Sequence, residues 1–190
     1  MPLLVLLGIA AAAIAWAIST YNGLVSLKNG TDASWRQVDV QLKRRHDLVP
    51  NLVETVRGAM DFEKGTLEAV VAARTRAVDA RGPAEVSAAE GDLTRSLGRL
   101  FAVVEQYPDL KSNRNVQQLQ DELTNTENLV AVARQQYNEQ VRSLNTRRES
   151  FPANLIAERF GFGPREYFEG SAADREPPRV ALSGSPSPRA

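Results

Sequence analysis

The sequence predicts an all-α protein: an N-terminal transmembrane helix, an antiparallel up-and-down four-helix bundle and a disordered C-terminal tail. Residues 1–27 carry no charged side chain. Between residues 31 and 150, apolar residues recur at alternating steps of three and four, the spacing of packed helices. Glycine and proline are sparse in that stretch and frequent after it. We therefore divide the chain into a membrane anchor (1–27), a helical bundle (28–170) and a tail (171–190).

The anchor segment is long enough to cross a bilayer as one helix, because about 20 apolar residues suffice. A cleaved signal peptide needs a basic segment before its apolar run. Here only the terminal amine of Met1 precedes that run. We therefore expect an uncleaved anchor, with Trp16 and Tyr21 at the lipid–water boundary. A cleaved signal peptide and an exported bundle are the alternative.

Orientation in the membrane follows from basic residues on one side of the anchor. None precedes the apolar run, and five follow it: Lys28, Arg36, Lys43, Arg44 and Arg45. Basic residues favour the cytoplasmic side. We expect a single-pass cell-membrane protein with its N-terminus outside and its bundle in the cytoplasm.

The first bundle helix is predicted to continue directly from the anchor. Positions at alternating steps of three and four form a coiled-coil seam, apolar except at Arg45: Trp35, Val38, Leu42, Arg45, Val49, Leu52, Val56 and Ala59. Pro50 lies inside this helix, where its ring removes one backbone hydrogen bond. The seam keeps its phase across Pro50, which predicts a kink and not a break. His46, Asp47 and Asn51 are candidates to bond the freed backbone groups.

Three further helices are predicted. The second runs from about residue 67 and ends at residues 81–83, and the third spans about 86–105. The fourth spans about 113–149, roughly 55 Å at 1.5 Å per residue. A turn at residues 60–65 separates the first two helices; without it the body is three antiparallel helices. A short aromatic segment, residues 155–168, is expected to pack back on the bundle, whereas residues 171–190 lack the apolar surface needed to order themselves.

Composition excludes several functions. Lysine plus arginine equals aspartate plus glutamate at 23 each, so there is no field to attract nucleic acid. One histidine and no cysteine cannot build a multi-histidine or thiolate metal site. The sequence has no phosphate-binding loop and no ordered catalytic triad. We expect no enzyme activity, no catalytic residue, no cofactor, no metal and no small-molecule substrate.

Arg45 is the most informative polar residue because it falls on the apolar seam. A buried arginine requires a partner, and the candidates are Asp47, Glu122 and Glu127. A second polar set lies on helices that otherwise present apolar faces inward. Such residues either fix helix register or form a partner-binding patch, and we favour the former. The structural and interaction candidates are Arg45, Asp47, Pro50, Asn51, Arg74, Glu127, Asn128, Arg134, Tyr137 and Asn138.

An ordered set of short motifs resembles the LemA family over about residues 20–170. The opening signature is residues 45–53, after Trp35 and residues 39–42, with His46 at a position expected to vary. The remaining matches are residues 73–74, 107–111, 119–120, 126–128, Arg134, residues 137–138, Asn145, and residues 151–154, 156–157 and 167–168.

The resemblance implies a bacterial membrane protein with one N-terminal membrane helix, a helical body and no established enzymatic activity. Relatives include a protein needed for magnetosome formation and others associated with membrane-embedded zinc peptidases. We therefore expect an adaptor or scaffold in membrane or envelope organisation, with the bilayer and either a membrane protein or a second copy as partners. The alternative is an accessory or substrate-adaptor subunit of a membrane-embedded peptidase.

The first prediction is that the anchor remains on the mature chain, because no basic segment precedes its apolar run. Mass spectrometry of protein extracted from membranes should detect the peptide that begins at Met1 or Pro2. A mature chain that begins near Ile14 or Ile18 would contradict it.

Overall fold

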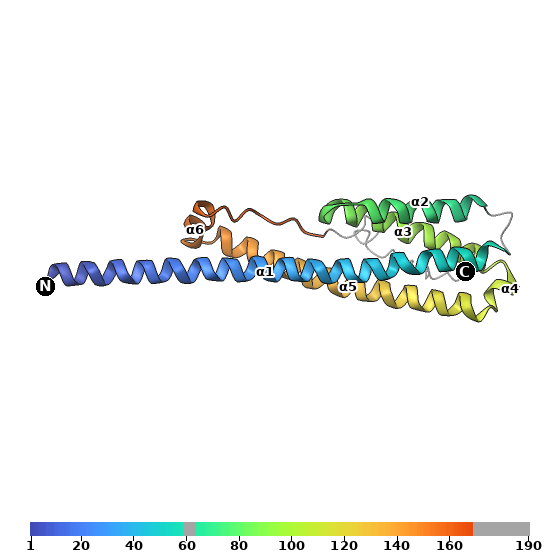
Figure 1. The fold of residues 1–190 in the computed structure, drawn as a ribbon, viewed down its shortest axis with the longest axis horizontal. Coiled ribbons are helices and arrows are strands. Elements are labelled where there is room, and N and C mark those ends of the chain that lie inside the picture. Colours follow the sequence, from blue (N-terminus) through green and yellow to red (C-terminus); the bar gives the residue numbers. More distant parts are fainter. Residues whose placement is uncertain (59–63, 169–190) are drawn as a thin grey trace, which may run out of the picture.

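The computed structural model describes residues 1–58 and 64–168, which form helices, turns and one extended segment. The helices are α1 (Pro2–Arg57), α2 (Lys64–Asp79), α3 (Gly82–Val104), α4 (Pro108–Lys111), α5 (Arg114–Glu149) and α6 (Ala153–Arg159). Figure 1 shows an elongated body from which the first part of α1 projects. The predicted all-α fold is confirmed.

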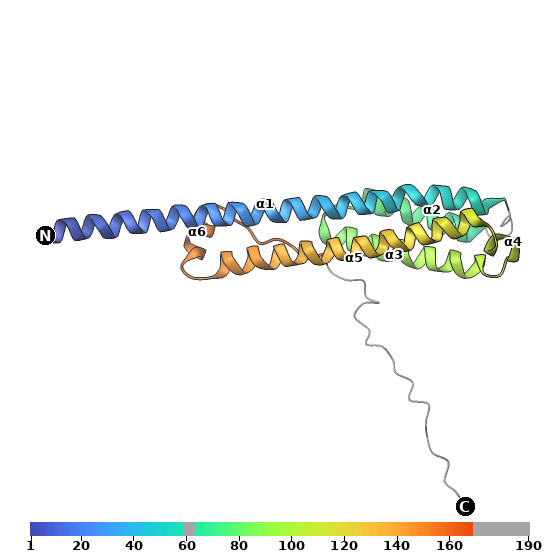
Figure 2. The ribbon, with the colours of Figure 1, turned by 90° about the horizontal axis from the view of Figure 1, so that it is seen from below.

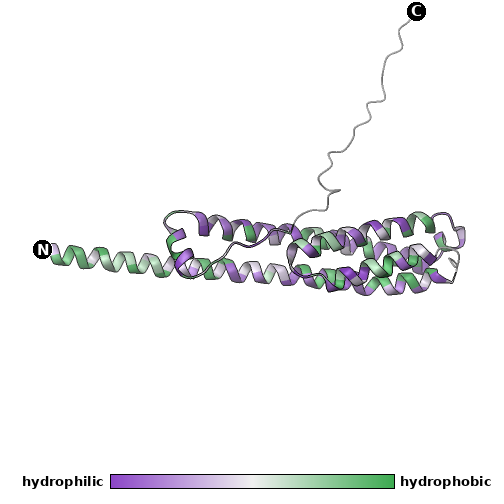
Figure 3. Ribbon diagram, turned by 90° about the horizontal axis from the view of Figure 1, so that it is seen from above, coloured by the Kyte–Doolittle hydropathy of each residue, from purple (hydrophilic) through white to green (hydrophobic). Residues whose placement is uncertain are grey.

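Helix α1 joins the N-terminal apolar run to the body without interruption over 56 residues. Its projecting part is mostly hydrophobic around its surface (Figure 3), and almost none of it is buried. Among the described residues, α1 is the one helix long and apolar enough to span a membrane. Farther along, the predicted seam is buried at Val38, Leu42, Arg45, Val49, Leu52 and Val56.

The body has a far half, next to Arg57, and a near half, next to Leu24. Helix α5 runs antiparallel to α1 along both halves, and the α2–α3 hairpin packs on the far half (Figures 1 and 2). Four helices therefore lie side by side in the far half, as the up-and-down bundle predicts. The three-helix alternative is wrong, because α1 ends at Arg57 and α2 begins separately at Lys64. Most of the predicted turn at residues 60–65 lies outside the described residues.

Apolar clusters fill the body in succession from the far half to the near half. The far cluster includes Leu52 and Leu93, and the middle cluster includes Val38 and Val141. The near cluster joins α1 to α5 and α6 through Leu24, Leu144 and Ala157. Removing this apolar surface from water is the main term that favours the folded state.

Helix boundaries agree with the predictions to within about three residues, except at the start of α3. This helix begins at Gly82, four residues earlier than expected. Gly82 has a positive φ of 75°, which glycine adopts without steric cost. Pro83 then occupies the first turn, where its missing N–H has no cost. At the start of α5, the Asn113 side chain caps the helix by accepting the Asn115 N–H at 2.9 Å.

The segment after α6, residues 162–168, is extended and runs back along the near half (Figure 2). Phe168 is buried, and its ring centroid lies 6.1 Å from that of Trp35. The rings of Phe160 and Phe162 meet Tyr21 edge-on, with centroid distances of 5.0 and 5.6 Å. The predicted packing of this aromatic segment on the bundle is therefore confirmed. The predicted disordered tail, residues 171–190, lies outside the described residues.

Candidate functional site

Arg45 lies inside the far half with only 3% of its surface exposed. Its Nη1 donates to Glu90 Oε2 on α3 at 3.0 Å, and its Nη2 donates to Thr94 Oγ1 at 2.8 Å. The carboxylate of Glu127 on α5 lies 3.6 Å from Nη2. A guanidinium is tolerated in such a place only with charged and hydrogen-bonding partners. Arg45 thus links α1 to both α3 and α5.

His46, the only histidine of the chain, is buried beside Arg45. Its Nε2 lies 2.5 Å from Glu90 Oε1, so both oxygens of the buried Glu90 carboxylate are occupied. The imidazole is therefore engaged inside the bundle and not presented to solvent. This geometry favours a structural role for His46.

Pro50 explains a further contact of the same turn of α1. In a regular helix, the N–H of residue 50 would donate to the carbonyl of His46, and proline has no such N–H. Arg74 Nε on α2 donates to that carbonyl at 3.1 Å instead. The expectation that His46, Asp47 or Asn51 satisfies the freed backbone is therefore wrong. Arg74, which lies 24 positions after Pro50 in the sequence, supplies the donor that Pro50 lacks.

These contacts form what we call the polar hub, which consists of Arg45, His46, Arg74, Glu90, Thr94 and Glu127. One turn of α1 makes polar contacts with α2, α3 and α5 there. Arg45 Nε is buried without a hydrogen-bond partner among the described residues. The hub therefore pairs its buried charges with one another but leaves one buried polar atom, Arg45 Nε, without a hydrogen bond to any described residue. Within the described part of the chain, no three His, Cys, Asp or Glu side chains gather as a metal site would require.

A second polar arrangement fastens the extended segment to the near half of α5. Asn138 Nδ2 donates to the Phe168 carbonyl at 2.9 Å, and the Phe168 N–H donates to Asn138 Oδ1 at 2.8 Å. Asn145, seven residues along α5, makes the same pair of bonds with the backbone of Arg165, at 2.9 and 3.0 Å. Each side-chain amide thus acts like a peptide unit of a neighbouring strand. We call this pair the asparagine clamp.

Tyr137 and Arg165 reinforce the clamp from α5 and from the segment itself. The Tyr137 hydroxyl donates to the Glu166 carbonyl at 2.8 Å, while its ring packs edge-on against Trp35. Burial raises the pKa of Tyr137 above its usual range, which keeps this hydroxyl protonated as a donor. Arg165 pairs with Asp32 of α1 at 2.8 Å. The segment is thereby bound to both long helices.

The predicted candidates therefore separate into two groups and a remainder. Arg45, Arg74 and Glu127 belong to the polar hub, and Pro50 lies one turn farther along α1. Asn138 belongs to the asparagine clamp, which Tyr137 reinforces. Arg134 is half-buried and engaged with neighbouring groups. The other three candidates, Asp47, Asn51 and Asn128, have exposed side chains.

Of the predicted partners of Arg45, Glu127 is confirmed at 3.6 Å, whereas Asp47 and Glu122 are wrong. Asp47 is exposed, and Glu122 accepts from Gln118 on its own helix. The principal partner is Glu90, which the sequence analysis missed. A signal was available, because Glu90 stands on the apolar seam of α3 between Val86 and Leu93. Asn145 was also missed as a clamp residue, although it lies one heptad after Asn138.

Fold and site define the class: a helical-bundle protein with an N-terminal helix able to span a membrane and a charged hub in its interior. The sequence pattern of the LemA family matches residues 34–182, and the chain belongs to that family. Magnetosome protein MamQ 2 of Paramagnetospirillum magneticum is 27% identical over 87% of this chain and 71% of its own length. Protein LemA of Metamycoplasma hominis is 26% identical over 81% of this chain and 71% of its own length.

Replacing Arg45 with alanine should strongly destabilise the body. The change leaves Glu90 buried without its cationic partner, and loss of one member of a buried pair costs about 3–5 kcal/mol. Thermal unfolding followed by circular dichroism measures the effect. Arg142→Ala is the matched control, because Arg142 is exposed and pairs with Glu139 on the surface of α5. Equal, small shifts in melting temperature for both variants would contradict a structural role for the hub.

Replacing both clamp asparagines with leucine should release the extended segment while the helices persist. The N–H groups of Arg165 and Phe168 lose their acceptors, so their hydrogen exchange should accelerate. Mass-spectrometric exchange on residues 162–168 measures this effect. Asn128→Leu, an exposed change on the same helix, should leave that exchange unaltered. Unchanged protection in the double variant would show that apolar packing alone retains the segment.

Proposed function

We propose that this protein is a membrane-anchored adaptor that presents a rigid helical body at a fixed position relative to the bilayer. The observation that carries the proposal is the continuity of α1. One helix contains the apolar run and also forms one of the bundle helices along the whole length of the body. A flexible linker would let the body reorient freely; a continuous helix packed against α5 and α6 does not.

The placement of the polar residues supports a structural role over catalysis. The buried charges bond to one another, and the only histidine is engaged by Glu90. The clamp side chains bond to backbone. These groups are already occupied, whereas a general acid or base must reach a substrate. We propose that the chain performs no reaction and requires no cofactor.

The partner in this proposal is a membrane protein or a second copy of the chain, bound through the outer surface of the body. Val40 on α1 and Val132 on α5 are large apolar residues exposed on that surface. A photoreactive amino acid at either position should yield a discrete adduct in living cells. The same label at the buried Val38 should react only within the chain.

Adduct identity distinguishes the possible roles. Adducts with a second copy or with a non-enzymatic membrane protein support the adaptor. An adduct with a membrane peptidase would favour the accessory-subunit alternative. If both exposed positions label only lipid in cells where the labelled protein is functional, the adaptor proposal fails.

The orientation we propose places the N-terminus outside and the body in the cytoplasm, because five basic residues follow the apolar run. A reporter enzyme that is active only outside the cytoplasm, fused to the C-terminal end, should be silent. A cytoplasm-active reporter at the same place should give signal. The reverse pair of results would overturn this orientation.

His46→Gln should preserve biological activity, because glutamine can still bond to Glu90 and the proposed role needs no imidazole. Complementation of a deletion strain measures this, with melting temperature as the check on folding. His46→Ala is the comparison, since it removes the bond and should lower stability. A His46→Gln protein that folds normally but fails to complement would show that the imidazole takes part in a reaction.

A further inference from the structure

The end of the body that faces the projecting part of α1 exposes several large apolar side chains. Phe151, in the turn between α5 and α6, is 81% exposed, and Leu155 and Phe160 are also largely exposed. Helix α6 lies across this end of the body (Figures 1 and 2). Both exposed phenylalanines of the described chain lie at α6. Contact with water alone does not explain why large apolar side chains gather at one end of the body, because exposed apolar patches mark interaction sites.

The position of these side chains along α1 is fixed by Tyr21. The ring of Phe160 packs against Tyr21, which follows the apolar run that ends at Ile18. A hydrocarbon layer of about 30 Å takes about 20 helical residues. Counted from Pro2, that length brings α1 to Tyr21. Phe160 and α6 thus lie at the height where α1 would leave the hydrocarbon.

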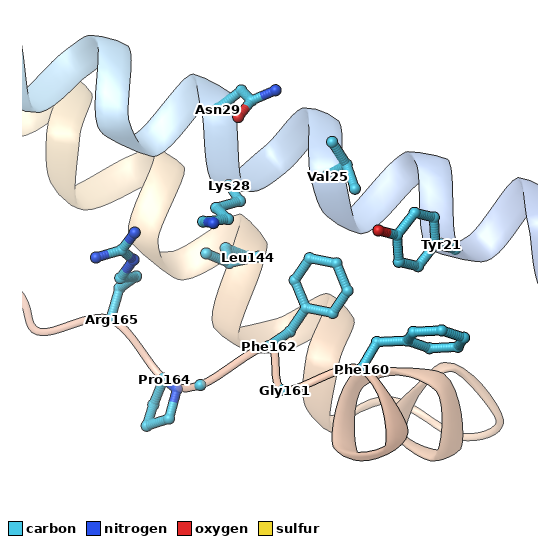
Figure 4. Close-up of a pocket in the computed structure, with 11 residues that line it drawn as sticks. Tyr21, Val25, Lys28, Asn29, Leu144, Phe160, Gly161, Phe162, Pro164 and Arg165 are labelled. Carbon is cyan, nitrogen blue, oxygen red and sulfur yellow. The ribbon is translucent and has the colours of Figure 1, made fainter.

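A cavity of about 490 Å³ lies next to this aromatic contact, between α1 and the loop after α6. Figure 4 shows Tyr21 and Phe160 at its end nearer the N-terminus, and Lys28 and Arg165 at the other end. Arg165 is partly neutralised by Asp32 at 2.8 Å. Lys28 has no carboxylate partner among the described residues. The cavity is therefore apolar and aromatic towards the proposed membrane and cationic away from it.

We propose that α6 and this cavity form a phospholipid-binding site, which rests on the proposed anchoring of the chain by α1. Phe151, Leu155 and Phe160 enter the boundary between acyl chains and headgroups. The phosphate of a lipid in the same leaflet lies against Lys28. A phospholipid presents the same order of chemistry, with apolar chains first and an anionic phosphate farther out. Because α1 already tethers α6 to the leaflet, the apolar side chains of α6 meet the lipid at a high effective concentration.

The absence of native cysteine allows one spin label to be placed at a chosen position of the full chain. The test variants are Leu155→Cys on α6 and Val132→Cys near the middle of α5, which have closely matched exposure at 56% and 53%. Ile9→Cys reports on the anchor itself. Each labelled chain is reconstituted in phosphatidylglycerol–phosphatidylcholine vesicles. Relaxation by oxygen, which enters lipid, is compared with relaxation by a water-soluble nickel complex.

The Leu155 label should be relaxed more by oxygen than by nickel, and the Val132 label should show the opposite. If both labels behave as fully aqueous while the Ile9 label lies in hydrocarbon, the docking of α6 is overturned and the anchor stands. If the Ile9 label is also aqueous, the anchor itself fails. Circular dichroism confirms that each labelled chain is folded.

The phosphate contact has a separate test in Lys28→Gln, matched by Lys43→Gln on the exposed surface of α1 farther along the body. Native mass spectrometry of the detergent-purified chain counts bound phospholipid. Lys28→Gln should lose bound phospholipid, whereas Lys43→Gln should retain the wild-type amount. Equal retention by both variants would overturn the assignment of the phosphate to Lys28.

Discussion

The arrangement of the four bundle helices depends on charges buried in one turn of α1. Arg45 and His46 both bond to Glu90 of α3, and the carbonyl of His46 accepts from Arg74 of α2. Buried charge is strongly unfavourable when its partner is missing. The hub is therefore compensated only when α2 and α3 stand in one register against α1. Apolar seams of valine and leucine tolerate shifted packings more readily, so the hub acts as the register-setting element.

The asparagine clamp plays the corresponding part in the near half, where only the tip of the α2–α3 hairpin reaches, with Gly82 and Pro83 beside Tyr137. Each of the two amides binds an N–H and a carbonyl of the returning segment, which satisfies backbone groups that no helix or sheet serves there. Arg165 and Asp32 tie the same segment to α1. The hub and the clamp together support α1 on both halves of the body. This support fixes α1 against the other elements along the whole body.

The sequence predicts local features well and long-range pairing poorly. The seam of α1, the extent of the fourth predicted helix and the burial of Arg45 all follow from spacing, because helical periodicity is a local property. Glu90 was missed as a partner because Arg45 and His46 lie on another helix, and local periodicity does not show which helices meet. Arg74 and Asn145 could not be assigned roles, since their partners are backbone groups brought near by the fold. The pattern of residue types does not show which backbone carbonyl will lie next to a given side chain.

The most direct measurement of the hub's role is a double-mutant cycle between Arg45 and Glu90. Arg45→Met, Glu90→Leu and the combined variant are unfolded with denaturant in the same detergent, and their free energies of unfolding are compared. Each single change leaves a charge buried without its main partner, whereas the double change removes both charges. The account predicts that the double variant loses much less stability than the sum of the singles, with a coupling in the range of about 0.5–3 kcal/mol found for contacting residues. Additive losses would show that the two side chains do not depend on one another and would contradict the central role of the hub.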